Sequence, residues 1–189
     1  ITQEKWCELG QPLNKKLSDK EQQVLEQESC FTLIRNKMLS FLATREHSAE
    51  ELRRKLKQNS SLSKTVDFSE LIERCLLEMK EKGFQSDDRF TRKYVESKLA
   101  NKSYGPLKII AGLFKRGISR EQANLVLNEL GDQELWLKKS IQCLEKIKKK
   151  GKTHTPHVLS QKLYQQGFTW ETIEQAVEKI QEMGNFSVE

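Results

Sequence analysis

The chain has 189 residues, of which 36% are hydrophobic and 32% are charged. This apolar content is too high for full disorder and too low for one large hydrophobic core. No window approaches the roughly 20 uncharged apolar residues that a spanning helix needs, and the first ten residues lack the apolar run of a signal peptide. We therefore expect a cytoplasmic protein with no membrane contact, built from one domain or several small ones.

Positive charge is concentrated in the middle of the chain. The net charge is +6, yet residues 1–48 hold seven basic and seven acidic side chains. Residues 85–120 hold nine basic and three acidic side chains, which equals the excess of the whole chain. A localised basic surface indicates a partner that is a polyanion or an acidic protein face. A solvated helix surface is the alternative.

The first third of the sequence predicts an N-terminal extension followed by three helices. Ser18 and Glu21 form a capping box, so residues 18–27 are expected to be helical and to end there or to continue into a long helix over 31–45. Ser48 and Glu51 form a second box that starts the next helix. A third helix is predicted by apolar residues recurring on one face at Leu71, Ile72, Cys75, Leu76 and Met79.

The same three-helix pattern then occurs twice more. Long helices are expected over 89–102 and 135–149, and each is followed by a short helix that begins at a proline, Pro106 or Pro156. The third helices follow Ser119 and Thr169. The apolar positions of the three units align as Leu52/Ile109/Leu159, Leu56/Leu113/Leu163, Ile72/Ala123/Ile173, Cys75/Val126/Ala176, Leu76/Leu127/Val177 and Met79/Leu130/Ile180.

This periodicity predicts an all-α fold of three tandem three-helix repeats that form an elongated curved array with an N-terminal helical extension. A repeat of about 50 residues buries its apolar face by stacking on its neighbours. The expected divisions are an extension over 1–30 and repeats over 31–86, 87–131 and 132–189. A stretch rich in Ser and Asn over 57–65 is expected to be a loop inserted in the first repeat.

No catalytic or metal-binding pattern accompanies these helices, so we expect a protein that is not an enzyme and needs no cofactor. The glycines are scattered at helix ends, and the four cysteines are too far apart for a Cys-x-x-Cys pair, which favours reduced thiols. His154 and His157 flank Pro156 and point apart. Asp87 and Asp88 follow Ser86 at a helix start, where acidic residues complement the helix dipole.

Three blocks of the sequence resemble RecX-family regulators of the RecA recombinase. They are LATREHSAEELRRKL over 42–56, KGFQSDDRF over 82–90 and YGPLKIIAGLFKRGI over 104–118, in that order. With the more polar third repeat, the resemblance covers about 34–184. It departs from the family in the extension over 1–30 and in the third repeat.

The resemblance implies a bacterial cytoplasmic protein of DNA repair, homologous recombination and the SOS response, with no catalytic residue. Such a protein lodges in the groove of the RecA filament on single-stranded DNA and lowers its ATPase, coprotease and strand-exchange activities. The expected partner is therefore the filament, with single-stranded DNA as a further contact, and the protein is expected to be a monomer.

The binding surface is expected on basic residues that the apolar pattern leaves outside the core. The candidates are Arg53, Arg54, Lys57, Arg89, Arg92, Lys93, Lys108, Lys115 and Arg116. For Arg54 the alternative is an ion pair with Glu50 one turn earlier. Phe90, Tyr94, Tyr104 and Pro106 are expected to be core and helix-positioning residues, with contact to the partner as the alternative.

The alternative function is a stand-alone helical DNA-binding protein that uses its basic middle repeat. The turn over 115–120 joins two helices in the manner of a helix-turn-helix. Residues 121–130, however, contain no basic residue, although Gln122, Asn124 and Asn128 could reach bases.

Overall fold

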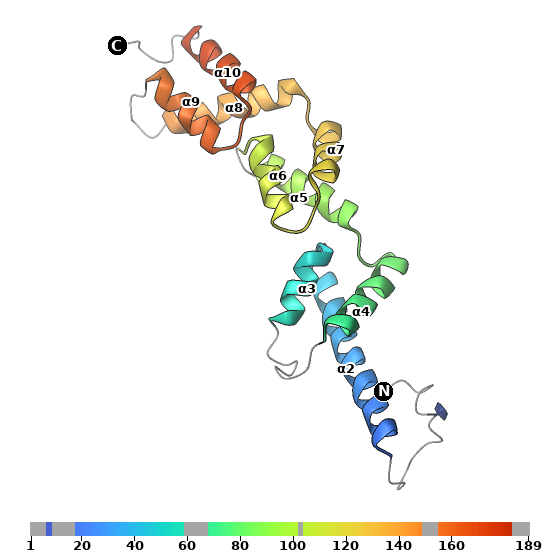
Figure 1. Ribbon diagram of the computed structural model, residues 1–189. Coiled ribbons are helices and arrows are strands. Elements are labelled where there is room, and N and C mark those ends of the chain that lie inside the picture. Colours follow the sequence, from blue (N-terminus) through green and yellow to red (C-terminus); the bar gives the residue numbers. More distant parts are fainter. Residues whose placement is uncertain (1–6, 9–17, 59–67, 102–103, 149–154, 183–189) are drawn as a thin grey trace. The chain divides into compact units, whose positions relative to one another are not determined.

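A computed structural model of the chain describes residues 7–8, 18–58, 68–101, 104–148 and 155–182 (Figure 1). Every regular element in these ranges is an α-helix, and the helices form three consecutive triplets, as the sequence predicts. The first is α2 (Asp19–Leu42), α3 (Ala49–Lys57) and α4 (Ser69–Glu81); the second is α5 (Asp87–Asn101), α6 (Pro106–Phe114) and α7 (Arg120–Leu130); the third is α8 (Gln133–Lys148), α9 (Pro156–Gln165) and α10 (Trp170–Glu182).

The helix starts follow the predicted caps. Ser18 accepts a hydrogen bond from the Glu21 amide, and the Glu21 carboxylate accepts one from the Ser18 amide at 2.8 Å, which completes the capping box. The Ser48 and Ser119 hydroxyls cap α3 and α7 by accepting hydrogen bonds from the amides of Glu51 and Gln122, at 3.1 Å and 3.2 Å. Thr155 is the N-cap residue of α9, but its side chain makes no capping hydrogen bond, so Pro156 supplies the local preference for a helix start.

The chain divides into two compact units, Ile1–Asp87 and Asp88–Glu189. The first unit contains α2, α3 and α4, which pack on one another around a single apolar cluster. Its centre consists of fully buried side chains from all three helices, namely Ile34, Met38, Leu52, Leu56, Ile72, Cys75 and Met79. Removing these side chains from water is the main stabilising contribution to this unit.

The second unit contains the other two triplets, and they share one apolar cluster. Phe90 and Val95 of α5 and Leu113 of α6 belong to the same cluster as Leu163 of α9 and Ile173 of α10. Figure 1 shows α9 and α10 beside α8, and all three of these helices pack on one another. Repeats 2 and 3 therefore form one core, and neither buries its apolar face alone.

Backbone hydrogen bonds join repeats 2 and 3 end to end. The amides of Gly105 and Leu107, at the start of α6, donate to the carbonyls of Gln166 and Gly167, just beyond the end of α9, at 2.8 Å and 3.0 Å. The two bonds thus pair amides at the start of α6 with carbonyls just beyond the end of α9, groups that lack partners within their own helices. Gly167 has φ +83, which favours glycine, and the two backbones approach so closely that a Cβ at Gly105 would lie 2.3 Å from Gly167.

The first long helix begins at Asp19 and continues through residue 30 as one helix, which is one of the two alternatives that the sequence left open. The structure differs from the sequence prediction in two other places. Leu130 is half-buried, whereas its counterparts Met79 and Ile180 are buried. The last residue of α3 is Lys57, so the expected loop begins later; its remainder lies outside the described residues. The predicted boundaries of the extension and the three repeats remain predictions.

Candidate partner-binding surface

Arg53 joins two helices of the first unit. Its guanidinium donates to both oxygens of Glu73 on α4, at 2.6 Å and 2.8 Å, and reaches Glu50 at 3.4 Å. The hydrogen bond to Glu73 raises the pKa of Arg53, and the same bond lowers the pKa of the Glu73 carboxyl. Two parallel bonds of this kind fix geometry. Arg53 therefore holds α3 against α4.

Arg54 and Lys57 on the same helix face solvent. Both are exposed, and neither makes an ion pair with a residue that the structure describes. Glu50, the partner that the sequence offered to Arg54, is bound by Arg53 instead. Arg54 and Lys57 are thus the two candidates of the first unit whose charges point outward.

The basic residues of α5 are partly neutralised within the second unit. Arg92 donates to the Glu129 carboxylate of α7 at 2.5 Å, and Lys93 reaches Glu96 at 3.4 Å along its own helix. Both pairs are exposed, and such pairs contribute about 0–1 kcal/mol. Arg89, Arg92 and Lys93 are all solvent-exposed, as the sequence predicts.

The candidates on and after α6 differ in role. Lys108 donates to Gln166 at 3.0 Å and lies 4.4 Å from the centre of the Tyr104 ring, so it helps to join repeats 2 and 3. Arg116 donates to the Gly112 carbonyl at 2.7 Å and covers the Tyr94 ring. Lys115 is exposed and makes no ion pair with a described residue. Of these three, Lys115 alone presents its charge to solvent without a described partner.

The aromatic residues near these cations are largely internal. Phe90 is buried, and Tyr94, Tyr104 and Pro106 are half-buried. The Tyr94 ring lies between two cations, Lys98 and Arg116, each 4.9 Å from its centre. The prediction that these four residues serve the core is confirmed for Phe90, while the two tyrosines also hold cations at the surface.

A polar network at the start of α3 was not apparent in the sequence. His47 is fully buried; its Nδ1 lies 3.0 Å from the Glu51 carboxylate, and its Nε2 lies 3.5 Å from the Lys55 ammonium. Nδ1 faces a carboxylate and therefore carries the proton, which leaves Nε2 to accept from Lys55. Burial lowers the pKa of His47, against the opposing effect of the Glu51 hydrogen bond.

The same network ties α3 to Asp87, the last residue of the first unit. Asp87 accepts hydrogen bonds from the Ala49 amide and from the Gln85 side chain, both at 2.9 Å, and Gln85 also donates to the His47 carbonyl. The sequence indicated that Asp87 stabilises its own helix start. In the structure it also satisfies an amide 38 residues away. Nothing in the local spacing reveals a contact of that range.

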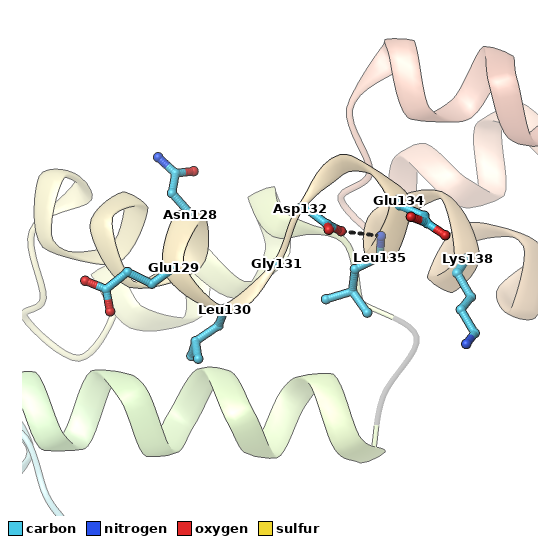
Figure 2. Close-up of a pocket in the computed structure, with 8 residues that line it drawn as sticks. All are labelled: Asn128, Glu129, Leu130, Gly131, Asp132, Glu134, Leu135 and Lys138. Atoms are coloured by element: carbon cyan, nitrogen blue, oxygen red, sulfur yellow. Dashed lines mark hydrogen bonds between the residues drawn. The ribbon is translucent and has the colours of Figure 1, made fainter.

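A pocket of about 440 Å³ lies at the junction of α7 and α8 in the second unit (Figure 2). It is lined by Asn128, Glu129, Leu130, Gly131, Asp132, Glu134, Leu135 and Lys138. Asp132 accepts a hydrogen bond from the Leu135 amide at 2.8 Å and so caps α8, the contact dashed in Figure 2. Glu129 binds Arg92. Two of the three carboxylates that line the pocket, those of Glu129 and Asp132, thus have structural partners.

Within the residues that the structure describes, no three His, Cys, Asp or Glu side chains gather in a way that could hold a metal ion. His154 lies outside those residues, and His157 is exposed. None of the four cysteines forms a disulfide bond, and Cys75 and Cys143 are buried in the two cores, as the sequence predicts for reduced thiols. No helix in the described ranges is long and apolar enough to span a membrane.

Comparison with known proteins identifies the family. The family model of RecX, second three-helix domain, matches residues 86–127, which hold α5, α6 and most of α7. A regulatory protein RecX from Pseudomonas syringae pv. tomato is 35% identical over 112 residues, an alignment that covers 56% of this chain and 68% of that protein. The chain belongs to the RecX family.

Other relatives and solved structures agree. A regulatory protein RecX from Pseudomonas fluorescens Pf-5 is 35% identical over 98 residues, covering 52% of this chain and 59% of that relative's length. A crystal structure of regulatory protein RecX superposes with a TM-score of 0.76 at 15% identity, covering 94% of this chain and 88% of that one. RecX from Lactobacillus salivarius gives 0.70 at 19% identity, covering 82% and 99%. At these identities the structures show a shared fold.

Proposed function

We propose that this RecX-family chain is a non-enzymatic regulator that binds the filament of a RecA-type recombinase on single-stranded DNA. It lowers the ATPase, coprotease and strand-exchange activities of that filament, and it acts as a monomer in the bacterial cytoplasm during DNA repair and recombination. Membership of the RecX family carries this proposal, since the matched relatives are named regulatory proteins.

The arrangement of the basic residues supports binding to an anionic or acidic partner and divides the candidates into two groups. Arg53, Lys108 and Arg116 make contacts that join helices or repeats. Arg54, Lys57 and Lys115 are exposed without a described ion-pair partner, and Arg89, Arg92 and Lys93 form an exposed row on α5. We infer that Arg54, Lys57 and Lys115 contribute most of the electrostatic attraction, because a cation already held in a short contact, such as Arg92 with Glu129, has less to gain from a new one.

The alternative of a stand-alone DNA-binding protein has less support. Apart from Arg120 at its first position, α7 has no basic residue. The Gln122 side chain donates a hydrogen bond to Asp88, so it already has a partner within the protein. A recognition helix needs several side chains that can reach base edges. Single-stranded DNA is therefore proposed as a contact made together with the recombinase.

Binding measurements separate the two functions. Fluorescently labelled protein is titrated with assembled recombinase filament and, separately, with bare single-stranded DNA over a range of salt concentrations. We expect tight binding to the filament and weak binding to bare DNA that is lost at physiological salt. Equal affinity for both at physiological salt would favour the DNA-binding alternative.

Charge-reversal variants then locate the contact. Arg54→Glu with Lys57→Glu, and Arg89→Glu with Lys115→Glu, are expected to weaken filament binding while leaving helicity unchanged. The matched control reverses Lys80 and Lys179, one exposed lysine of each unit that is not a candidate. An equal effect in the control would show that only the total charge matters.

A further inference from the structure

The second helix of each repeat turns the same three positions to solvent. By the alignment of the repeats these are Glu50, Arg54 and Lys57 on α3, Leu107, Ala111 and Phe114 on α6, and His157, Gln161 and Tyr164 on α9. All nine residues are exposed. Their spacing of four and three residues places each set along one side of its helix.

The middle set alone is entirely apolar. Leu107 and Phe114 are 49% and 64% exposed, and Ala111 lies between them. The corresponding positions of repeat 1 are all charged, and those of repeat 3 are His157, Gln161 and Tyr164, an exposed aromatic residue that carries a hydroxyl group. The fold therefore does not require apolar residues here, so their presence on α6 needs another cause. We call Leu107, Ala111 and Phe114 the α6 stripe.

We propose that the α6 stripe is a docking site for a protein surface of apolar side chains bordered by carboxylates, contributed by a protomer of the recombinase filament. This inference rests on the proposed function and names the surface that performs it. Exposed apolar side chains grouped in this way mark sites of interaction with other proteins.

Charge complementarity selects this partner. Lys115 follows Phe114 directly and is exposed without a described ion-pair partner, and a second lysine, Lys108, follows Leu107 in the sequence. α6 itself, Pro106–Phe114, contains no Asp or Glu. A partner that offers carboxylates beside its apolar residues would pair with this basic edge and also gain attraction during encounter.

The same charges disfavour two other occupants. A second copy of this chain packed face to face on the stripe would bring lysines together with no carboxylate from α6 between them. Single-stranded DNA needs a series of aromatic platforms and cations, whereas the stripe offers one aromatic ring, Phe114. Leucine and alanine side chains suit an apolar protein surface better than a base stack.

The other repeats supply the test substitutions. In the full chain, Leu107→Glu with Phe114→Lys places the residues of repeat 1 on α6, so we expect the variant to fold with unchanged helicity and thermal midpoint. The matched control is Leu125→Glu on α7 of the same unit, a leucine that is 66% exposed. Lys115→Glu and Lys115→Arg test the basic edge separately.

Affinity for assembled filament is measured for all variants. We expect the stripe variant to bind at least about ten-fold more weakly and Lys115→Glu to bind several-fold more weakly, with Leu125→Glu and Lys115→Arg close to the parent. Parental affinity in the stripe variant, or an equal loss in the control, would overturn the docking site and leave the proposed function standing. A parent chain that does not bind filament would overturn both.

Two further measurements identify a different occupant. If the stripe variant changes the sedimentation behaviour of the chain without recombinase, the stripe joins two copies. If it loses affinity for bare single-stranded DNA to the same extent as for filament, the stripe holds nucleic acid. Either outcome would contradict docking to the recombinase.

Discussion

Gly105→Ala is expected to damage the second unit by separating repeats 2 and 3. Gly105 has φ −78, which alanine adopts without strain, so by backbone preference alone the substitution would be neutral or slightly stabilising. The new Cβ, however, would lie 2.3 Å from the carbonyl carbon and oxygen of Gly167 and from the amide of Phe168. Backbone atoms cannot rotate aside, so the two repeats must move apart.

The expected loss follows from these contacts. Overpacking of a tight site costs about 1–3 kcal/mol. The movement also weakens the hydrogen bonds from Gly105 to Gln166 and from Leu107 to Gly167, each contributing about 1 kcal/mol. We therefore expect the free energy of unfolding of the second unit to fall by about 2–5 kcal/mol, a large share of the stability of a small domain.

Hydrogen exchange measured peptide by peptide distinguishes the two units. Faster exchange is expected in α6, α9 and α10 of Gly105→Ala, with the first unit unchanged. The control is Gly112→Ala in the interior of α6, where the new Cβ meets only the end of the Tyr94 side chain and alanine favours the helix. Unchanged exchange in Gly105→Ala, or a larger effect in Gly112→Ala, would refute the inferred backbone contact.

Three other substitutions test the account. Leu113→Ala should cost about 2–5 kcal/mol and loosen both repeats of the second unit, because its side chain lies in their common core; urea denaturation followed by exchange measures this. The first unit should lose stability as the pH falls below about 6.5, because the unfolded chain binds a proton at His47 that the buried ring resists; His47→Gln should remove this step from pH-dependent unfolding curves. Arg53→Ala should cost at most about 1 kcal/mol, since the pair with Glu73 is half-exposed, and should reduce filament binding less than Arg54→Glu; a larger effect on binding would mean that Arg53 itself contacts the partner.

Local signals in the sequence predicted most of the fold. Periodic apolar residues and capping serines specify where a helix lies, and these features act within a few residues. Leu56, Leu113 and Leu163 were aligned by sequence alone, and all three are fully buried. The capping box at Ser18 likewise predicts the start of α2 at Asp19, but its early turns carry few buried residues, so the sequence left open whether this helix continues into the long one.

Contacts between distant segments could not be predicted from the sequence. Nothing in the spacing of Gly105 and Gly167 shows that their backbones meet, and Asp87 gave no sign of its bond to the Ala49 amide. The nine candidate binding residues were chosen because they are basic and outside the apolar pattern. That criterion does not separate Arg53, which holds two helices together, from Arg54, which faces solvent.

The most direct test of the account is the ATP hydrolysis rate of a RecA-type filament on single-stranded DNA, measured as this chain is added. We expect hydrolysis to fall with increasing protein towards a low plateau and the protein alone to hydrolyse no ATP. The Leu107→Glu, Phe114→Lys variant is expected to require more protein for the same effect. Unchanged hydrolysis at a large excess of the parent chain would contradict the regulatory function.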